Sequence, residues 1–312
     1  MFALPDPDYE ANPKYRRYLD AVDSDLRREA LAYFMKGFRQ HYERHLSSPE
    51  IQYDARIGEG DHVLRALQED GCSLTRIEPE RKAQLVKLTE DYAVQLHERL
   101  DQLERPRFKD GQHHLDPDKD ATIFAAVDEL FHAEHVYAAG SAYAGRQVKL
   151  KTMAVQVNTA RSTALTYGEL NDAGLPKPRT RYLHVDSALW PPLKVLIYLN
   201  EVGPDDGPFR YVVGSHRIAS EFELMVRKTN DKLGIQRERF MALPLELRKY
   251  TDFGGVMDPK GPHAKALMSR ERQFCDGVSD LILFDFNGVH RGGFVRKGPR
   301  YMLQCCFEGS ED

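Results

Sequence analysis

The chain has 312 residues, of which 41% are hydrophobic and 29% are charged, as is ordinary for a globular protein. Its net charge of -4 and its pI near 6.3 argue against a nucleic-acid partner, because such proteins usually carry a basic face. No window reaches the roughly 18 apolar residues of a membrane span, and residues 1–8 lack the pattern of a secretory signal. We therefore expect a cytoplasmic protein without a membrane partner. Its four cysteines lack metal-type spacing and are expected to be reduced thiols.

Helical periodicity dominates the first part of the chain, where apolar residues recur at intervals of three and four. Gly71 is a typical helix C-terminal residue, and Pro79 suits the first turn of a long helix. In chain order, we predict helices over 23–45, 61–70, 79–103 and 121–139, with a strand over 72–77 and a polar loop over 105–117.

From about Gly145 the pattern changes to alternation of polar and apolar residues, which is typical of strands. A polar insertion with helical parts interrupts this region between residues 220 and 271. The predicted strands cover 148–158, 181–186, 193–199, 209–213, 280–286 and 300–307. Helices followed by short, mostly antiparallel strands predict an α+β fold, namely a jelly roll supported by N-terminal helices.

Three side chains from two of these strand regions form a candidate metal site. His184 and Asp186 lie two residues apart on a predicted strand, so their side chains share a face. His290 follows a strongly apolar strand, just past Asn287-Gly288, where the chain can turn a side chain inward. An isolated His-x-Asp is usually a surface hydrogen-bonded pair. Two imidazoles and one carboxylate, with open positions left over, suit a non-haem Fe(II) centre that activates oxygen.

An arginine soon after His290 would supply the cation that an α-keto acid cosubstrate needs. Arg300 begins an alternating strand, so the sheet sets the direction of its side chain. Arg296 lies in a loop before Pro299, where a solvated charge is the simpler interpretation. We therefore favour Arg300 as the cosubstrate residue and leave open whether Arg296 assists it.

The stretch from His184 to Arg217 resembles the phytanoyl-CoA dioxygenase (PhyH-like) family of Fe(II)/2-oxoglutarate dioxygenases. The resemblance rests on His184-x-Asp186, Gly207-Pro208-Phe209, Gly214-Ser215-His216-Arg217, His290 and an arginine ten residues later, and it covers about 67–307. Val213 stands where the family usually has proline.

The resemblance implies a double-stranded β-helix with His184, Asp186 and His290 as iron ligands and Arg300 holding 2-oxoglutarate. It also implies an oxygenase domain over 66–312, with a lid at about 220–271, after a helical extension over 1–65. O2 and 2-oxoglutarate would yield succinate and CO2 while a C–H bond of a small metabolite is hydroxylated.

Several further residues are candidates for the same pocket. Gln156 and Asn158 lie on the first long strand, where a polar residue usually helps to hold 2-oxoglutarate, although an outward-facing position fits equally well. Trp190 is a candidate for the substrate pocket or for a packed position in the sheet. Arg210 and Arg291 are candidate substrate residues. Basic residues near the site indicate an anionic substrate, unless they are a scattered, solvated set: Lys177, Arg179, Arg181, Lys194, Arg210 and Arg217.

Two other functions stay open at this point. A cupin-type metalloprotein that does not use 2-oxoglutarate, such as an isomerase or a cosubstrate-free dioxygenase, would have no need of Arg300. A non-catalytic binding protein on the same fold would not need the full ligand set. His132 with His135, the pair His113-His114, and His216 are better explained as structural residues than as ligands. The oligomeric state and the bond attacked are left open.

Overall fold

The computed structural model describes residues 61–106, 108–163, 186, 193–216, 268–275, 280–286 and 288–309. The predicted helix over 23–45, most of the insertion over 220–271, and the predicted strand over 181–186 except Asp186 lie outside these ranges. In the part of the chain that is described, no helix is both long enough and apolar enough to cross a membrane.

Glycine and proline residues mark where two of the helices end or begin. Gly71, with a φ of 82°, follows α3, and Pro79 stands in the first turn of α4, so both helices occur as predicted. The helix predicted over 121–139 is wrong as a single element, because the chain breaks it at His135, whose φ is 56°. The helices are α3 (Asp61–Asp70), α4 (Pro79–Gln102), the 3-10 helix η1 (Phe108–Gly111), α5 (Ala121–Ala133), α6 (Val136–Ala144) and α7 (Ala160–Thr163).

The strands form two sheets in which every pairing is antiparallel. The six-stranded sheet has the order β1-β7-β4-β9-β3-β2, and the three-stranded sheet has the order β6-β5-β8. Antiparallel sheets combined with helices agree with the predicted α+β class. The strands are β1 (Cys72–Thr75), β2 (Gln112–His114), β3 (Val148–Asn158), β4 (Leu193–Tyr198), β5 (Phe209–Val212), β6 (Glu271–Gln273), β7 (Leu281–Asp285), β8 (His290–Gly292) and β9 (Arg300–Gly309).

The loop predicted over 105–117 is wrong in part, because Gln112–His114 form strand β2 and Phe108–Gly111 form η1. Strand β2 pairs with β3 at the edge of the large sheet, with Gln112 opposite Gln156 and His114 opposite Ala154. Its three residues are all polar, so they carry no alternation of polar and apolar positions. The strand exists because of pairing with a distant segment, which local sequence does not reveal.

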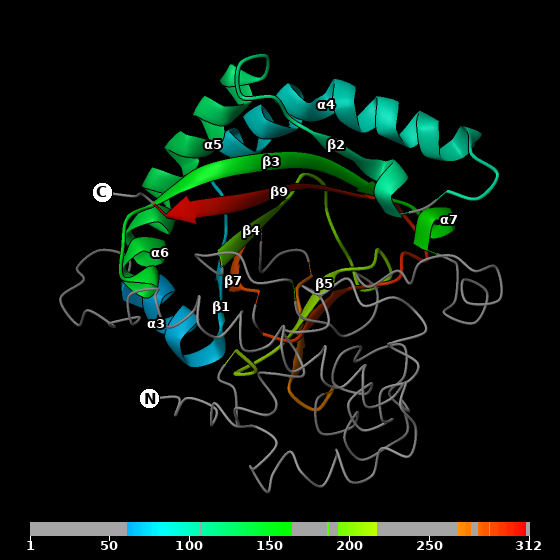
Figure 1. The fold of residues 1–312 in the computed structure, drawn as a ribbon. Coiled ribbons are helices and arrows are strands. Elements are labelled where there is room, and N and C mark those ends of the chain that lie inside the picture. Colours follow the sequence, from blue (N-terminus) through cyan, green and yellow to red (C-terminus); the bar gives the residue numbers. More distant parts are fainter. Residues whose placement is uncertain are drawn as a thin grey trace, which may run out of the picture.

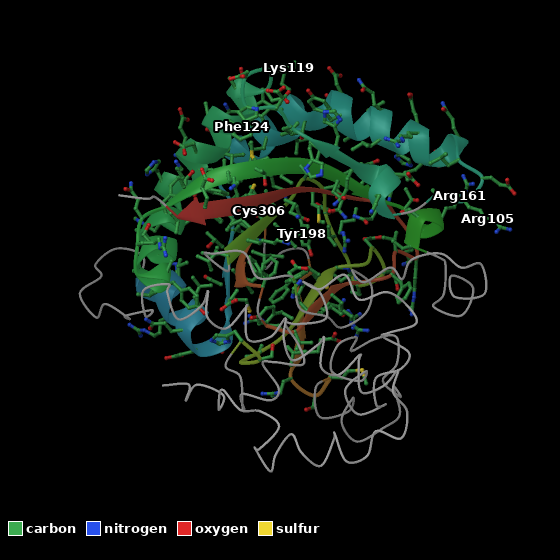
Figure 2. All side chains as sticks on the ribbon, viewed as in Figure 1. Arg105, Lys119, Phe124, Arg161, Tyr198 and Cys306 are labelled. Atoms are coloured by element: carbon green, nitrogen blue, oxygen red, sulfur yellow. The ribbon has the colours of Figure 1, made fainter. Side chains whose placement is uncertain are left out.

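The large sheet has a different apolar layer on each of its faces. On β9, Leu303 and Cys305 belong to a core shared with the helices, whereas Met302 belongs to a core between the sheets. Figure 1 shows α4, α5 and α6 beside β3, with β5 on the other side of β9. Figure 2 likewise shows Phe124 in the helical layer and Tyr198 beneath β9. Side chains on the second face therefore point toward the space between the two sheets.

Candidate functional site

A cavity of about 160 Å³ lies between the two sheets. The large sheet contributes polar side chains from neighbouring strands, and the small sheet contributes Phe209, His290 and Gly292. Asp186, His290, Gln156 and Arg300, which the sequence analysis singled out, meet here. The lining residues are Gln112, Gln156, Asp186, Lys194, Leu196, Phe209, Phe284, His290, Gly292, Arg300, Met302 and Gln304.

His290 begins β8, and its imidazole is held on several sides. The ring centroid lies 5.2 Å from that of Phe284 and 5.7 Å from that of Phe209, and Tyr211 stacks on it with an interplanar angle of 12°. Nδ1 donates a hydrogen bond to the Gly288 carbonyl oxygen at 2.8 Å, because a carbonyl can only accept. In the neutral ring the lone pair is therefore on Nε2, the nitrogen suited to bind a metal.

Asp186 lies directly across from this nitrogen. Its backbone N–H donates to the Phe286 carbonyl oxygen at 3.1 Å, which fixes the chain beside the end of β7. The Oδ2 atom of Asp186 lies 3.6 Å from His290 Nε2 and also pairs with Lys194 Nζ. Burial lowers the pKa of Lys194, but the charge of Asp186, the nearby Cys306 and the hydrogen bond to Asp186 together outweigh it, so the net pKa is raised.

A carboxylate oxygen and an imidazole nitrogen that face each other across a cavity fit two ligands of one divalent metal ion. The same pair forms an ion pair if His290 is protonated. The third predicted ligand, His184, lies outside the described residues. Accordingly, no group of three potential metal-binding side chains occurs among the residues that the structure describes.

Arg300 is the other notable charge of the cavity. It is the first residue of β9, it is only 2% exposed, and its Nε and Nη1 atoms have no hydrogen-bond partner in the described structure. Burial lowers the pKa of Arg300, whereas nearby Tyr198 acts in the opposite direction. A buried guanidinium without partners is costly, so its presence points to an anion that binds there.

Amide side chains extend from the edge of the sheet toward Arg300. Gln112 Nε2 donates to Gln156 Oε1 at 3.4 Å, and Gln156 Nε2 donates to Asn158 Oδ1 at 3.2 Å. Asn158 pairs with Arg300 across β3 and β9, so the two side chains share a face. The Asn158 Nδ2 atom is buried and has no hydrogen-bond partner among the described residues. This donor lies beside Arg300, although Asn158 is not among the residues that line the cavity.

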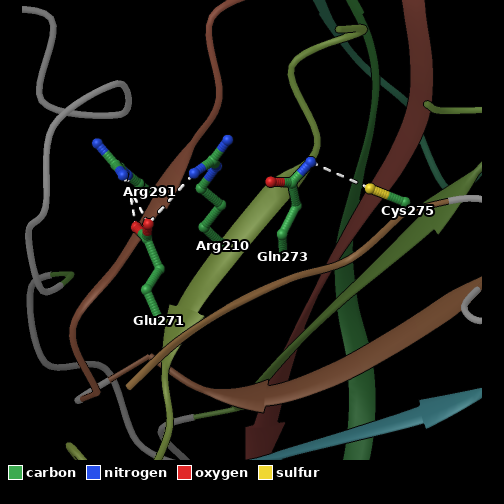
Figure 3. A network of polar contacts seen from close by, with 5 residues as sticks. All are labelled: Arg210, Glu271, Gln273, Cys275 and Arg291. Atoms are coloured by element: carbon green, nitrogen blue, oxygen red, sulfur yellow. Dashed lines mark hydrogen bonds and ion pairs between the residues drawn. The ribbon is translucent and has the colours of Figure 1, made fainter. Parts of the chain in front are cut away.

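Arg210 and Arg291, both predicted to contact substrate, are bound to one glutamate. Arg291 Nε and Nη2 donate to Glu271 Oε1 and Oε2, each at 2.6 Å, and Arg210 Nη1 lies 3.3 Å from Glu271 Oε2 (Figure 3). These contacts tie β5, β6 and β8 together. Neither arginine is among the residues that line the cavity described above.

The Gly214-Ser215-His216 segment connects α3 to the start of β8. The Gly214 N–H donates to the Asp70 carbonyl oxygen at 2.8 Å, and His216 Nε2 lies 3.1 Å from the Gln68 carbonyl oxygen. Ser215 Oγ accepts from the Val289 N–H at 2.7 Å, one residue before His290. The segment thus positions the candidate metal histidine, a role that the sequence motif alone did not reveal.

Two of the predicted residues, Arg296 and Trp190, remain. The Arg296 side chain is 77% exposed and reaches Asp205 at 3.8 Å, and Arg296 is not among the residues that line the cavity. Trp190 lies outside the described residues. Sequence reasoning named Lys194 only as one of a basic set and missed the pocket role of Gln112 and Gln304. Lys194 is a lone charge in an otherwise apolar strand, and this pattern could have indicated its place in the pocket.

No protein-family model matches the chain, and no curated protein matches it either. Solved structures are similar at low identity. EctD from S. alaskensis, with 2-oxoglutarate and 5-hydroxyectoine, is 14% identical with a TM-score of 0.46, covering 83% of this chain and 79% of EctD. HygX from Streptomyces hygroscopicus, with nickel and 2-oxoglutarate bound, is 14% identical with a TM-score of 0.45, covering 82% of this chain and 88% of HygX.

A third similar structure, EvdMO1, is 16% identical with a TM-score of 0.45, and the chain spans half of its length. Iron is bound in a further structure of EctD. Iron and 2-oxoglutarate, which were predicted from the sequence, thus occur in similar structures. We base the function on this chain's own side chains, because all these TM-scores lie below 0.5.

Proposed function

We propose that the chain is an Fe(II)/2-oxoglutarate-dependent dioxygenase of the PhyH-like type, with its two sheets forming a double-stranded β-helix. The substrate would be a small molecule with an unactivated C–H bond. The observation that carries the proposal is Arg300, a buried guanidinium whose Nε and Nη1 atoms have no partner among the described residues, in the same cavity as Asp186 and His290.

Each residue would have a distinct part in this function. Asp186, His290 and, from the sequence, His184 would hold Fe(II), which supplies the chemistry that activates O2 together with 2-oxoglutarate. Arg300 would grip the distal carboxylate of 2-oxoglutarate with two parallel hydrogen bonds, and Asn158 Nδ2 would add a third. Phe209, Phe284 and Met302 would keep the pocket apolar and restrict the access of water.

The binding of both cofactors can be tested without knowing the substrate. We expect a weak visible charge-transfer band when Fe(II) and 2-oxoglutarate are added to the protein without oxygen, and slow succinate formation when oxygen is admitted. Asp186→Ala should abolish the band because one ligand is lost, while circular dichroism shows an intact fold. Asp118→Ala, at an exposed turn, is the matched control and should retain the band.

The same experiment separates this function from a cupin-type activity without 2-oxoglutarate. In that alternative the protein binds iron, but 2-oxoglutarate produces no new absorption and Arg300→Ala changes no ligand affinity. If wild-type protein binds iron and yields neither the band nor succinate, the dioxygenase proposal is rejected.

A further inference from the structure

Lys194 places a positive charge inside the cavity, on the metal side. It is the only charged residue of β4, whose sequence is otherwise apolar except for the hydroxyl of Tyr198. Alternation along the strand puts Lys194 and Leu196 on the cavity face. The Lys194 side chain is 17% exposed, pairs with Asp186, and has Nζ 5.4 Å from the ring centroid of Phe286. A lysine ammonium is rarely buried unless it is paired, and Asp186 is its partner here.

Lys194 and Arg300 enter the cavity from well-separated positions. Lys194 pairs with Cys306 across β4 and β9, and Arg300 lies six residues before Cys306 on β9. At about 3.3 Å per residue, the strand positions that carry the two cations are roughly 20 Å apart. One anion of the size of 2-oxoglutarate, gripped at Arg300, therefore leaves Lys194 available at the other end.

Provided that the proposed function holds, the sum of the charges in the cavity shows that Lys194 needs a negatively charged partner. A divalent ion and Arg300 carry as much positive charge as Asp186 and the two carboxylates of 2-oxoglutarate carry negative charge. Of the described residues that line the cavity, Lys194 is then the one whose charge is not balanced. A metal ion on Asp186 would also repel the ammonium from its present partner.

We propose that Lys194 binds a carboxylate of the primary substrate, so that the substrate is a small carboxylic acid with an apolar body. A monoanion balances one ammonium, whereas a phosphate monoester would bring an excess of about one negative charge. Leu196, Phe209 and Phe284 provide the apolar surface for the rest of the molecule. The Phe286 ring attracts the displaced ammonium and keeps it beside the cavity.

The test uses full-length protein loaded with Ni(II) and 2-oxoglutarate, which is stable in air. The probes are 4-methylpentanoate and its uncharged amide, and binding is measured from the paramagnetic broadening of the probe's NMR signals. We expect wild-type protein to bind the carboxylate at least about tenfold more tightly than the amide, as one charge-assisted hydrogen bond supplies. Lys194→Met should reduce this preference to less than about twofold, and Lys194→Arg should retain most of it.

Lys151→Met is the matched control, because Lys151 is exposed on β3 and pairs with Glu308 at 2.8 Å. It should keep the wild-type preference. A wild-type protein without preference for the carboxylate, or a preference that survives Lys194→Met, overturns the proposal. So does a Lys194→Met variant that loses affinity for 2-oxoglutarate instead, because Lys194 then belongs to the cosubstrate site. Failure of wild-type protein to bind 2-oxoglutarate would instead reject the proposed function.

Discussion

At the scale of single residues, we expect Arg300 to contribute to ligand affinity but not to the stability of the ligand-free fold. Its Nε and Nη1 atoms are buried and have no partner in the part of the chain that the structure describes, so we expect the side chain to add little to the stability of the ligand-free fold. Residues of this kind persist at functional sites because they act on a ligand. Replacing the charge by an apolar group of similar length should therefore change affinity and stability in opposite directions.

We expect Arg300→Met to weaken the binding of 2-oxoglutarate about 10- to 100-fold, since two charge-assisted hydrogen bonds are lost. The same change should raise the free energy of unfolding of the ligand-free protein by about 1 to 3 kcal/mol, because a buried unpaired charge is removed. Calorimetry and chemical denaturation measure the two quantities.

Arg296→Met is the control for this prediction, because the Arg296 side chain is mostly exposed and, of the described acidic residues, pairs with Asp205 alone. It should alter neither quantity measurably. An Arg300→Met variant that binds 2-oxoglutarate normally but is less stable would show that Arg300 is a structural residue.

The sequence predicted that the sheet directs the Arg300 side chain, which lines the cavity, but it did not predict the partners of the other arginines. A residue that begins an alternating strand has its direction set by the sheet, which favoured Arg300 over Arg296. Arg210 and Arg291 were expected to contact substrate, but Glu271 pairs with both of them. Glu271 begins a three-residue strand after a long polar segment, so no local pattern announced the pairing.

At the scale of elements, the turn between β7 and β8 determines where His290 points. A Cβ atom on Gly288 would lie 1.8 Å from the Tyr211 hydroxyl oxygen, which itself donates to the Asp285 carbonyl oxygen at 2.9 Å. The Gly288 carbonyl oxygen accepts the hydrogen bond from His290. The close approach of Gly288 to Tyr211 is therefore linked to the orientation of the candidate metal ligand.

We expect Gly288→Ala to destabilise the fold by about 1 to 3 kcal/mol through overpacking and to weaken metal binding. Gly145→Ala is the matched control: its φ of 69° makes alanine unfavourable by about 1 to 2 kcal/mol, but it follows the end of α6 and is not among the residues that line the cavity. Thermal unfolding and a metal titration should thus show a loss of stability in both variants and a loss of metal affinity only in Gly288→Ala. Equal metal affinity in the two variants would contradict the link to His290.

The elements with strong local signals were predicted well, and those that depend on distant contacts were not. Strand β3 has the bounds predicted from alternation, and α4 begins at Pro79 as expected. Strand β2 and the break at His135 were missed, because pairing with β3 and a left-handed backbone at a non-glycine residue have no clear local pattern.

At the scale of the whole molecule, the six-stranded sheet separates a structural core from the functional cavity. The helices cover one face with a large apolar core that includes Leu100, Val127 and Leu303. The cavity lies on the other face, between the two sheets. Changes in the helical core should therefore affect stability far more than ligand affinity.

Leu100→Ala tests this separation, because Leu100 is fully buried between α4 and the large sheet. We expect a loss of about 2 to 5 kcal/mol in the free energy of unfolding from the cavity created. The 2-oxoglutarate affinity of the folded protein should stay within about twofold of wild type, as measured by calorimetry at a temperature where the variant is folded. A large loss of affinity would show that the two faces are coupled.

If Arg300 binds 2-oxoglutarate as proposed, the stability of the folded protein depends on the concentration of that ligand. A ligand that binds only the folded chain stabilises it by about 2.7 kcal/mol at a concentration one hundred times its dissociation constant. If that ligand is a keto acid of central metabolism, the fraction of folded chains would rise and fall with nutrient supply. Resistance of the purified protein to proteolysis at graded 2-oxoglutarate concentrations, with Arg300→Met as the insensitive reference, would reveal this dependence.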